Sequence, residues 1–391
     1  MMDALSVANL VSFEDLSGRD VRRILDTAED MARAIGFDGD APPIPVAPLD
    51  RILGIVFFEP STRTRLSFES AMLRLGGQTL GFYDAANCSV AKGETLADTI
   101  RVMSGYCDIL VMRHPLSGAA KVAADAAKVP VINAGDGHRE HPTQTLTDLF
   151  CIRRELKRLD GLKVGLCGDL KHGRTVHSLA PVLAQMGCEI ICISPPELPM
   201  PERYMTKIQA ASGTRPVETD DLQGTIADLD VLYMTRMQRE RFADSAEYDK
   251  ITGCFVLTPE MMEKGREQLK VLHPLPRIDE IAPEVDEDPR AAYFRQAAGG
   301  VPVRMALLAL LLRLPEYDVK DKSIGLGKAP RYTEAAPEVV APKSELQPVP
   351  GKGPCRNQQC ITTTEPVEPA FVKAEDGPVI CAYCEEEQTE H

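Results

Sequence analysis

The stretch FEPSTRTRLSFESAML, residues 58–73, joins two segments with different hydrophobic periods. It continues from the apolar run GIVFF at 54–58, which predicts a buried strand. Apolar residues then recur at helical spacing, at Phe68, Ala71, Met72 and Leu75. This spacing predicts a helix over residues 62–75, ended by two glycines. A strand that passes through a short polar turn into a helix indicates an α/β fold.

Short apolar runs alternate with helical patterns along most of the chain. The expected strands are 54–58, 108–112, 129–133, 162–167, 189–194, 230–234 and 270–272. A helix expected at 17–34 precedes them, with Ser17 and Asp20 in a capping box. This alternation predicts two α/β domains, each with a parallel sheet. We place them at residues 1–149 and 150–300, followed by a helix at 301–314 that packs back on the first domain.

The composition changes after residue 314. Prolines recur between small and charged residues, so 315–353 is expected to be an extended linker. Residues 354–391 form a short acidic tail that contains four grouped cysteines, and we expect a small third domain there.

Charge and composition narrow the classes of function. The formal net charge is −14, which argues against nucleic acid and anionic membranes as partners. The longest apolar run, 305–312, is too short to cross a bilayer. No secretory signal opens the chain, and seven cysteines are scattered singly, as reduced thiols are. We therefore expect a cytoplasmic protein.

Polar and basic clusters follow directly on five of the expected strands. They are 59–64, 113–115, 168–175, 235–238 and 273–277. Open parallel sheets bind ligands beyond the carboxyl ends of their strands, so the clusters are expected to converge on one or two clefts. Each arginine alone could form a surface ion pair, but five clusters in equivalent positions indicate a site for an anion.

The first cluster occupies the start of the expected helix at 62–75. Free backbone N–H groups and the positive end of the helix dipole favour a phosphate near Ser61, Thr62, Arg63 and Thr64. Hydroxyls add donors, and an arginine adds a bidentate fork. The alternative is that Ser61 only caps the helix and the arginines are simply exposed. No glycine-rich GK[ST] loop occurs, so ATP is not implied.

Five motifs together resemble the catalytic chain of the aspartate carbamoyltransferases. They are FFEPSTRTRLSFE, GDGHREHPTQTLTDL, GDLKHGRTVHSL, YMTRMQRER and VLHPLPRIDEI, and the resemblance covers residues 5–314. The related ornithine enzymes usually have a cysteine in an HCLP motif where this chain has HPLP, at 273–276. The resemblance implies transfer of a carbamoyl group from carbamoyl phosphate to L-aspartate in pyrimidine synthesis. The alternatives are transfer to another amine and a non-catalytic scaffold for pyrimidine enzymes.

The resemblance also implies roles for individual residues. Ser61, Thr62, Arg63 and Thr64 would hold the phosphate of carbamoyl phosphate. Thr64, Arg113 and His141 would surround its carbonyl oxygen, and Gln144 would contact its amino group. The carboxylates of aspartate would be held by Arg174 and Arg236, with Thr175 and Gln238 beside them. The carbonyls of Leu275 and Pro276 would meet the amino groups.

These residue types suit the implied chemistry. An amine attacks an acyl phosphate through a tetrahedral oxyanion, which Thr64, Arg113 and His141 would stabilise as donors. The departing phosphate can accept the amine's proton, so no side chain is assigned as general base. No covalent nucleophile and no catalytic cofactor are expected.

The segment NCSVAKGETLADT, residues 87–99, resembles the mobile loop of the family, which reaches into a neighbouring subunit's site. Ser89 and Lys92 match its functional serine and lysine, although their spacing is one residue shorter than usual. Ser89 would contact carbamoyl phosphate, and Lys92 would contact both carbamoyl phosphate and aspartate. The resemblance thus implies a homotrimer with shared active sites.

Two histidines, His138 and His141, form an H-x-x-H pattern. It is not expected to bind metal, because no carboxylate or cysteine stands at ligand spacing and His141 has a role already.

The tail contains Cys355-x4-Cys360 and Cys381-x2-Cys384, two close pairs about twenty residues apart. This pattern predicts one structural zinc ion, and the reduced character of the other cysteines argues against disulfides. A DNA-binding ribbon is not expected, because residues 355–391 have eight acidic and two basic side chains.

The tail resembles the zinc domain of the regulatory chain of aspartate carbamoyltransferases, in CRNQQC and CAYCEEE. In that family the zinc domain docks on the catalytic chain and bridges trimers. The resemblance therefore implies two trimers joined through their own tails. The alternative is an independent domain that binds another pyrimidine enzyme.

Overall fold

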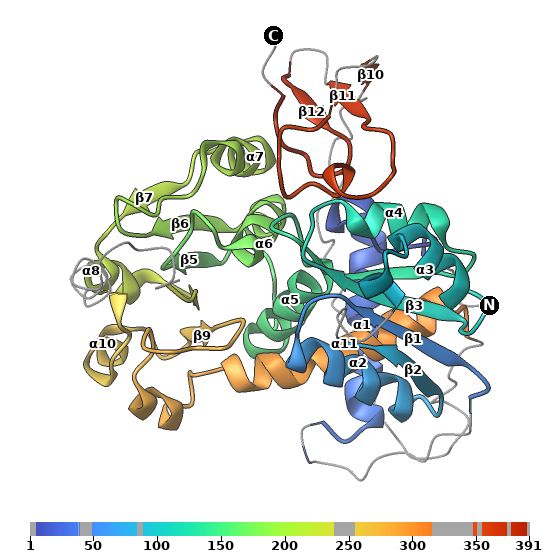
Figure 1. Ribbon diagram of the computed structural model, residues 1–391. Coiled ribbons are helices and arrows are strands. Elements are labelled where there is room, and N and C mark those ends of the chain that lie inside the picture. Colours follow the sequence, from blue (N-terminus) through green and yellow to red (C-terminus); the bar gives the residue numbers. More distant parts are fainter. Residues whose placement is uncertain are drawn as a thin grey trace. The chain divides into compact units, whose positions relative to one another are not determined.

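The computed structural model describes residues 5–37, 39, 49–83, 89–237, 255–314, 347–349, 354–373 and 377–388 (Figure 1). These residues form two compact units. The first unit draws on 1–143 and 301–391, and the second on 144–300. Each is built around its own parallel sheet, so the expected α/β class is confirmed.

The first unit contains a four-stranded sheet in the order β2-β1-β3-β4. Its strands are β1 (Ile52–Phe57), β2 (Gln78–Phe82), β3 (Ile109–His114) and β4 (Val131–Asp136), all parallel. Its helices include α1 (Gly18–Ala34), α2 (Thr62–Arg74), α3 (Leu96–Met103) and α4 (Ala119–Ala126). Strands β1, β3 and β4 match expected ones, whereas β2 was not predicted.

Local sequence sets the ends of these helices. Ser17 and Asp20 form the predicted capping box at the start of α1, with Asp20 N–H donating to Ser17 Oγ. The side of α1 that carries Val21, Ile24 and Leu25 is buried. Helix α2 ends at Arg74 and is followed by Gly76, whose positive φ suits glycine.

The second unit contains a five-stranded parallel sheet in the order β7-β6-β5-β8-β9. Its strands are β5 (Lys163–Cys167), β6 (Glu189–Ile193), β7 (Val217–Thr219), β8 (Val231–Met234) and β9 (Lys270–Leu272). Its helices include α5 (Pro142–Leu156, from Gln144 onward), α6 (Arg174–Gln185), α7 (Glu202–Ser212), α8 (Leu222–Thr225) and α10 (Pro259–Lys264). Of its strands, only β7 was not predicted.

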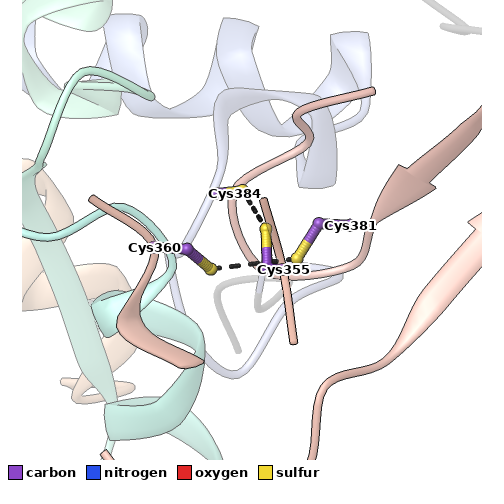
Figure 2. Close-up of side chains that lie close together, drawn as sticks. All are labelled: Cys355, Cys360, Cys381 and Cys384. Atoms are coloured by element: carbon purple, nitrogen blue, oxygen red, sulfur yellow. Dashed lines mark hydrogen bonds between the residues drawn. The ribbon is translucent and has the colours of Figure 1, made fainter. Parts of the chain in front are cut away.

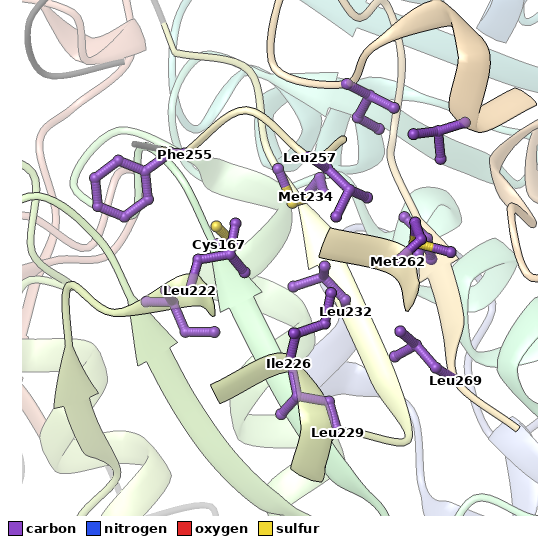
Figure 3. Close-up of a cluster of buried hydrophobic side chains, with 14 of the residues drawn as sticks. Cys167, Leu222, Ile226, Leu229, Leu232, Met234, Phe255, Leu257, Met262 and Leu269 are labelled. Atoms are coloured by element: carbon purple, nitrogen blue, oxygen red, sulfur yellow. The ribbon is translucent and has the colours of Figure 1, made fainter. Parts of the chain in front are cut away.

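A core cluster of this unit lies between β8 and the short helices that pack on the sheet (Figure 3). Leu232 of β8 and Ile226 and Leu229 before it have no exposed surface. They pack with Met262 of α10 and Leu269. This packing holds β8 and β9 in place and so positions the segments that follow these strands.

The tail forms a small antiparallel sheet of β10 (Gln347–Val349), β11 (Phe371–Lys373) and β12 (Val379–Cys381). It belongs to the first unit, and Ile361 and Phe371 share a hydrophobic core with Ile100 of α3 and Ala120 of α4. Helix α11 (Tyr293–Leu311) begins in the second unit, and its residues from 301 onward belong to the first unit. Within the described residues, no helix is both long and apolar enough to span a membrane.

Candidate active site

The sheet of the first unit has a topological switch point between β1 and β3. The chain leaves β1 toward β2 on one side and leaves β3 toward β4 on the other. Loops after two such strands diverge and leave a crevice at the carboxyl edge of the sheet. The segments that follow there are 58–61 after β1 and 115–118 after β3.

Helix α2 begins at this edge of the sheet, directly after β1. Ser61 is its N-cap residue, but its side chain makes no capping hydrogen bond, and the first turn contains no acidic residue. The interpretation of Ser61 as a simple cap is therefore not supported. Thr64 is buried, whereas Thr62 and Arg63 are exposed. The arrangement leaves a helix N-terminus with hydroxyl and guanidinium groups suited to an anion.

Arg113, at the end of β3, lies beside the same turn. Its Nη1 donates to the carbonyl of Ala134 at 3.1 Å, and its Nη2 lies 2.5 Å from Glu59 Oε1. A Cβ built on Gly135 would lie 2.8 Å from Arg113 Nη1 and 3.5 Å from His141 Cδ2. Gly135, with φ of +116°, therefore allows Arg113 and His141 to approach the same backbone position.

His141 precedes α5 and is almost fully buried. Its Nδ1 lies 3.3 Å from Thr143 Oγ1. The backbone N–H of the other histidine of the pair, His138, donates to Ser117 Oγ. Strands β3 and β4 and the loop at 137–141 thus bring together Arg113 and His141, two of the residues predicted to bind carbamoyl phosphate.

Gln144 lies in the first turn of α5, where its Nε2 donates to Asp148 Oδ1. Asp148 is fully buried and also accepts hydrogen bonds from Gln296 Nε2 at 2.7 Å and from Tyr233 OH at 2.9 Å. Sequence reasoning missed Asp148. The available signal was its position four residues after Gln144, on the same face of the helix.

The second unit has its own switch point, between β5 and β8. Arg174 and Thr175 begin α6 after β5, and Arg236 follows β8. The two loops touch, because a Cβ on Gly168 would lie 2.5 Å from Thr235 Oγ1. The structure therefore places both predicted aspartate-binding arginines on neighbouring loops of one sheet edge. Gln238 lies outside the described residues.

Leu275 and Pro276 follow β9 and are joined by a cis peptide bond. Leu275 N–H donates to His273 Nδ1 at 2.8 Å, so His273 carries its proton on Nε2, which lies 2.7 Å from Glu280 Oε1. His273 N–H donates to Gln296 Oε1. This buried set of bonds orients the segment 273–276, and the sequence motif alone did not reveal its partners.

Ser89 and Lys92 are the ends of a short 3₁₀ helix, η3 (Ser89–Lys92), in the first unit. Both side chains are exposed. Ser89 and Lys92 thus lie on the surface of this chain.

The four tail cysteines come together as predicted (Figure 2). All four are buried, and their sulfur atoms lie within 4.8 Å of one another. The Sγ–Sγ distances are 3.5 Å for Cys355–Cys384 and 3.8 Å for Cys360–Cys381. Zinc with bonds of about 2.3 Å to a tetrahedron of sulfurs requires sulfur separations of about 3.8 Å. The four thiolates therefore fit a structural zinc ion.

Two neighbouring side chains, Thr362 and Gln388, place hydrogen-bond donors near the cysteine sulfurs. Thr362 Oγ1 donates to Cys360 Sγ at 3.3 Å, and Gln388 Nε2 lies 3.7 Å from Cys355 Sγ. Donors of this kind orient thiolate ligands and offset their charge.

Comparisons with known proteins agree with this geometry. Residues 8–154 match the family described as aspartate/ornithine carbamoyltransferase, carbamoyl-P binding domain, and 160–311 match its Asp/Orn binding domain. Residues 351–391 match the aspartate carbamoyltransferase regulatory chain, metal binding domain.

Curated relatives and solved structures point to the same family. The aspartate carbamoyltransferase catalytic subunit of Thermococcus onnurineus is 51% identical over 308 residues, covering 79% of this chain and 98% of the relative. That of Thermococcus gammatolerans is 52% identical over 304 residues, covering 78% and 97%. The catalytic subunit of M. jannaschii aspartate transcarbamoylase matches with a TM-score of 0.74 and 46% identity, over 78% of this chain and 98% of that one.

A Trypanosoma cruzi aspartate transcarbamoylase solved with carbamoyl phosphate matches with a TM-score of 0.69 and 41% identity, over 77% of this chain and 94% of that one. The chain belongs to the aspartate carbamoyltransferase family: it joins a catalytic chain to the metal binding domain of a regulatory chain.

Proposed function

We propose that this chain is an aspartate carbamoyltransferase, which converts carbamoyl phosphate and L-aspartate to N-carbamoyl-L-aspartate and phosphate in de novo pyrimidine synthesis. One observation carries the proposal: each sheet presents donors for an anion at its own switch point. In the first unit they are the start of α2, Arg113 and His141, and in the second they are on the loops of Arg174 and Arg236.

Carbamoyl phosphate would bind in the first unit. Ser61, Thr62, Arg63 and Thr64 would hold its phosphate at the N-terminus of α2, where the helix dipole and backbone N–H groups favour an anion. Arg113 and His141, which meet at Gly135, would donate to the carbonyl oxygen with Thr64.

Gln144 would contact the amino group of carbamoyl phosphate. Because its Nε2 is bound by Asp148, its Oε1 is the atom available to accept a hydrogen bond from that group.

Aspartate would be held through its carboxylates by Arg174 and Arg236, with Thr175 and Gln238 beside them. The carbonyls of Leu275 and Pro276 would accept hydrogen bonds from the amino groups. The amine nitrogen forms the new C–N bond while the C–O bond to phosphate breaks. The released phosphate can take the proton, so the protein's part is orientation and stabilisation of the oxyanion.

We infer that the active form is a cytoplasmic homotrimer. Ser89 and Lys92 are exposed on η3, and in this proposal they complete the site of a neighbouring chain. The tail would hold a structural zinc ion, and tails docked across trimers would join two trimers through the segment 315–353. Docking on another pyrimidine enzyme is the competing outcome.

A product assay tests the activity. The purified chain is incubated with carbamoyl phosphate and either L-aspartate, L-ornithine or another amino acid, and carbamoylated product and phosphate are measured. The Arg113→Ala variant serves as the inactive control. Equal amounts of carbamoyl-aspartate and phosphate, formed with aspartate alone, are expected. Product with ornithine and none with aspartate would refute the proposal.

A further inference from the structure

The tail is joined to the first unit next to β3 through main-chain hydrogen bonds. Ser117 N–H donates to the carbonyl of Gln359, and Ile361 N–H donates to the carbonyl of Ser117, each at 3.0 Å. A Cβ on Gly118 would lie only 2.6 Å from Tyr383 Cβ, so the two backbones are in direct contact. The tail therefore covers the segment that leaves the carboxyl end of β3.

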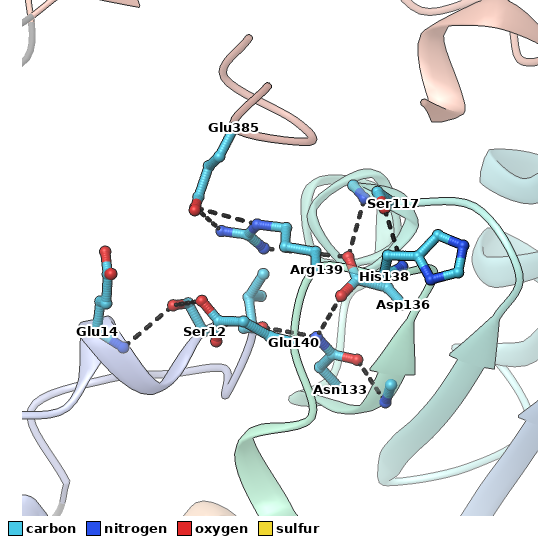
Figure 4. A network of polar contacts seen from close by, with 12 residues as sticks. Ser12, Glu14, Ser117, Asn133, Asp136, His138, Arg139, Glu140 and Glu385 are labelled. Carbon is cyan, nitrogen blue, oxygen red and sulfur yellow. Dashed lines mark hydrogen bonds and ion pairs between the residues drawn. The ribbon is translucent and has the colours of Figure 1, made fainter. Parts of the chain in front are cut away.

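An ion pair continues this contact into the loop at 137–141 (Figure 4). Arg139 Nε donates to Glu385 Oε1 at 3.0 Å, and Arg139 Nη2 binds the same carboxylate oxygen. The Arg139 side chain is 11% exposed, and its Nη1 lies 4.0 Å from Asp136 Oδ2. Because the Arg139 guanidinium is largely shielded from water, removing Glu385 weakens the compensation of a charge that is nearly buried.

The same loop is tied to β3 and β4 by short contacts. Gly137 N–H donates to the carbonyl of His114 at 2.8 Å, and Arg139 N–H donates to the carbonyl of Asp136 at 3.1 Å. Asp136 Oδ2 accepts from Gly118 N–H at 2.9 Å. Burial raises the pKa of Asp136, and the charge of Arg139 opposes that shift. Arg139 thus connects the tail to a tight turn that ends at His141.

A second carboxylate of the tail reaches the loop of Ser89 and Lys92. Glu365 Oε2 accepts a hydrogen bond from Leu96 N–H at 2.9 Å, at the first residue of α3. Helix α3 begins four residues after Lys92, so Glu365 fixes the carboxyl end of that loop. A carboxylate is favoured at such a helix start by its free N–H groups.

We propose that the docked metal-binding domain holds the site loops of its own chain in place, with Arg139 as the positioning residue that transmits the contact of Glu385 to His141. This inference rests on the proposed role of His141 in binding carbamoyl phosphate. It gives the tail a local function in the first unit that is independent of any bridging between trimers.

The ion pair is tested by a double-mutant cycle in the full-length, zinc-loaded chain. Arg139→Gln and Glu385→Gln are each expected to weaken carbamoyl phosphate binding about tenfold and to lower kcat, and the double variant should lose little more than either single one. The aspartate KM should change less than the carbamoyl phosphate affinity. Arg139→Lys should recover part of the loss, and the zinc content should be unchanged.

Gly118→Ala tests docking itself. Its methyl group would collide with Tyr383, which should raise hydrogen exchange in peptides covering 114–118, 359–362 and 136–141. Gly213→Ala is the matched control, because Gly213 has φ of +77° against +89° for Gly118 and nothing within 4 Å of its added Cβ. It imposes similar backbone strain without the collision and should leave exchange in these peptides unchanged.

Two outcomes would overturn the inference. One is strictly additive effects of Arg139→Gln and Glu385→Gln on carbamoyl phosphate affinity. The other is faster exchange at 114–118 and 359–362 in Gly118→Ala with no change at 136–141. The exchange measurement needs no turnover, so a failure of the proposed activity would appear separately, as absence of product from the wild-type chain.

Discussion

Gln144 and Asp148 are joined side chain to side chain across one turn of α5, with Gln144 Nε2 donating to Asp148 Oδ1 at 2.7 Å. Asp148 receives two further donors, from Tyr233 and Gln296. A carboxylate can accept all three, whereas an amide would turn an N–H₂ group toward one of them. The bond to Asp148 therefore fixes the orientation of the Gln144 amide.

Asp148→Asn should destabilise the chain and weaken carbamoyl phosphate binding. Leaving one or two buried donors unpaired costs about 1–3 kcal/mol each. Urea unfolding measures the stability, and titration with carbamoyl phosphate measures the affinity. Asp228→Asn, an exposed change in the same unit, is the control. Unaltered stability and affinity in Asp148→Asn would contradict this reading of the network.

Arg236→Ala should impair the use of aspartate and leave carbamoyl phosphate binding nearly intact. Loss of a charged hydrogen bond costs about 1.5–3 kcal/mol, so kcat/KM for aspartate should fall about tenfold to a hundredfold. Arg215→Ala removes an exposed arginine paired with Glu202 in the same unit and serves as the control. Near wild-type kcat/KM for aspartate in Arg236→Ala would show that the carboxylate assignment is wrong.

Mixing Lys92→Ala chains with Arg113→Ala chains should restore part of the activity that each variant lacks. In a hybrid trimer with shared sites, some sites combine the intact Arg113 of a Lys92→Ala chain with the intact Lys92 of a neighbouring Arg113→Ala chain. Activity is measured after subunit exchange has been proved with tagged chains. Fully exchanged hybrids without activity would count against a site completed by a neighbour.

Truncation after Leu314, or removal of zinc, should reduce the particle to a trimer that still makes carbamoyl-aspartate. Such a small domain has too little core to fold without its metal, so chelation should remove its contacts as truncation does. Light scattering gives the subunit count. Equal counts for full-length and truncated chains would rule out bridging of trimers by the tails and leave the enzyme assignment intact.

Acid should destabilise the second unit through His177. Burial lowers the pKa of His177 from its ordinary 6.5 to about 4, and its Nε2 lies 2.7 Å from the carbonyl of Leu170. The unfolded chain then binds a proton at a higher pH than the folded chain. Stability should fall by about 3 kcal/mol as the pH drops from 6.5 to 4.

The His177→Gln variant isolates this effect. It keeps a donor for the carbonyl of Leu170 and removes the titration, so its unfolding free energy should depend less on pH over this window. Urea unfolding of both chains at several pH values checks the difference. Parallel pH dependence of the two chains would disprove the assignment.

The sequence predicted the buried strands well because their signals are local. Strands such as β5 and β9 consist mainly of buried residues after an initial lysine, and their ends fell within one residue of the prediction. Strands β2 and β7 escaped because they are short and their mixed residues form no continuous apolar run. Helix α1 was found from its capping box and apolar face together.

Some residues of the candidate site could likewise be predicted from local sequence, and others could not. Residues in motifs at the carboxyl ends of strands or directly after them, such as Arg113 and Arg174, were predictable because strand ends gather at one edge of a sheet. Their partners were not, since Glu59, Asp148 and Glu280 act through contacts that only the folded chain makes. The cysteine spacing predicted the metal cluster, but nothing in the tail's sequence indicated that Glu385 would meet Arg139.

In the arrangement described above, the tail contacts a surface of its own polypeptide, so its docking there is unimolecular. A covalently tethered domain is typically held at an effective concentration of about 1 mM. A tail with an intrinsic dissociation constant of about 10 μM would then be bound in about 99% of chains, and a tenfold weaker one in about 90%. Dilution, which separates a catalytic chain from an independent partner, does not change this fraction, so the occupancy of the tail is set by the gene fusion and not by cellular protein levels.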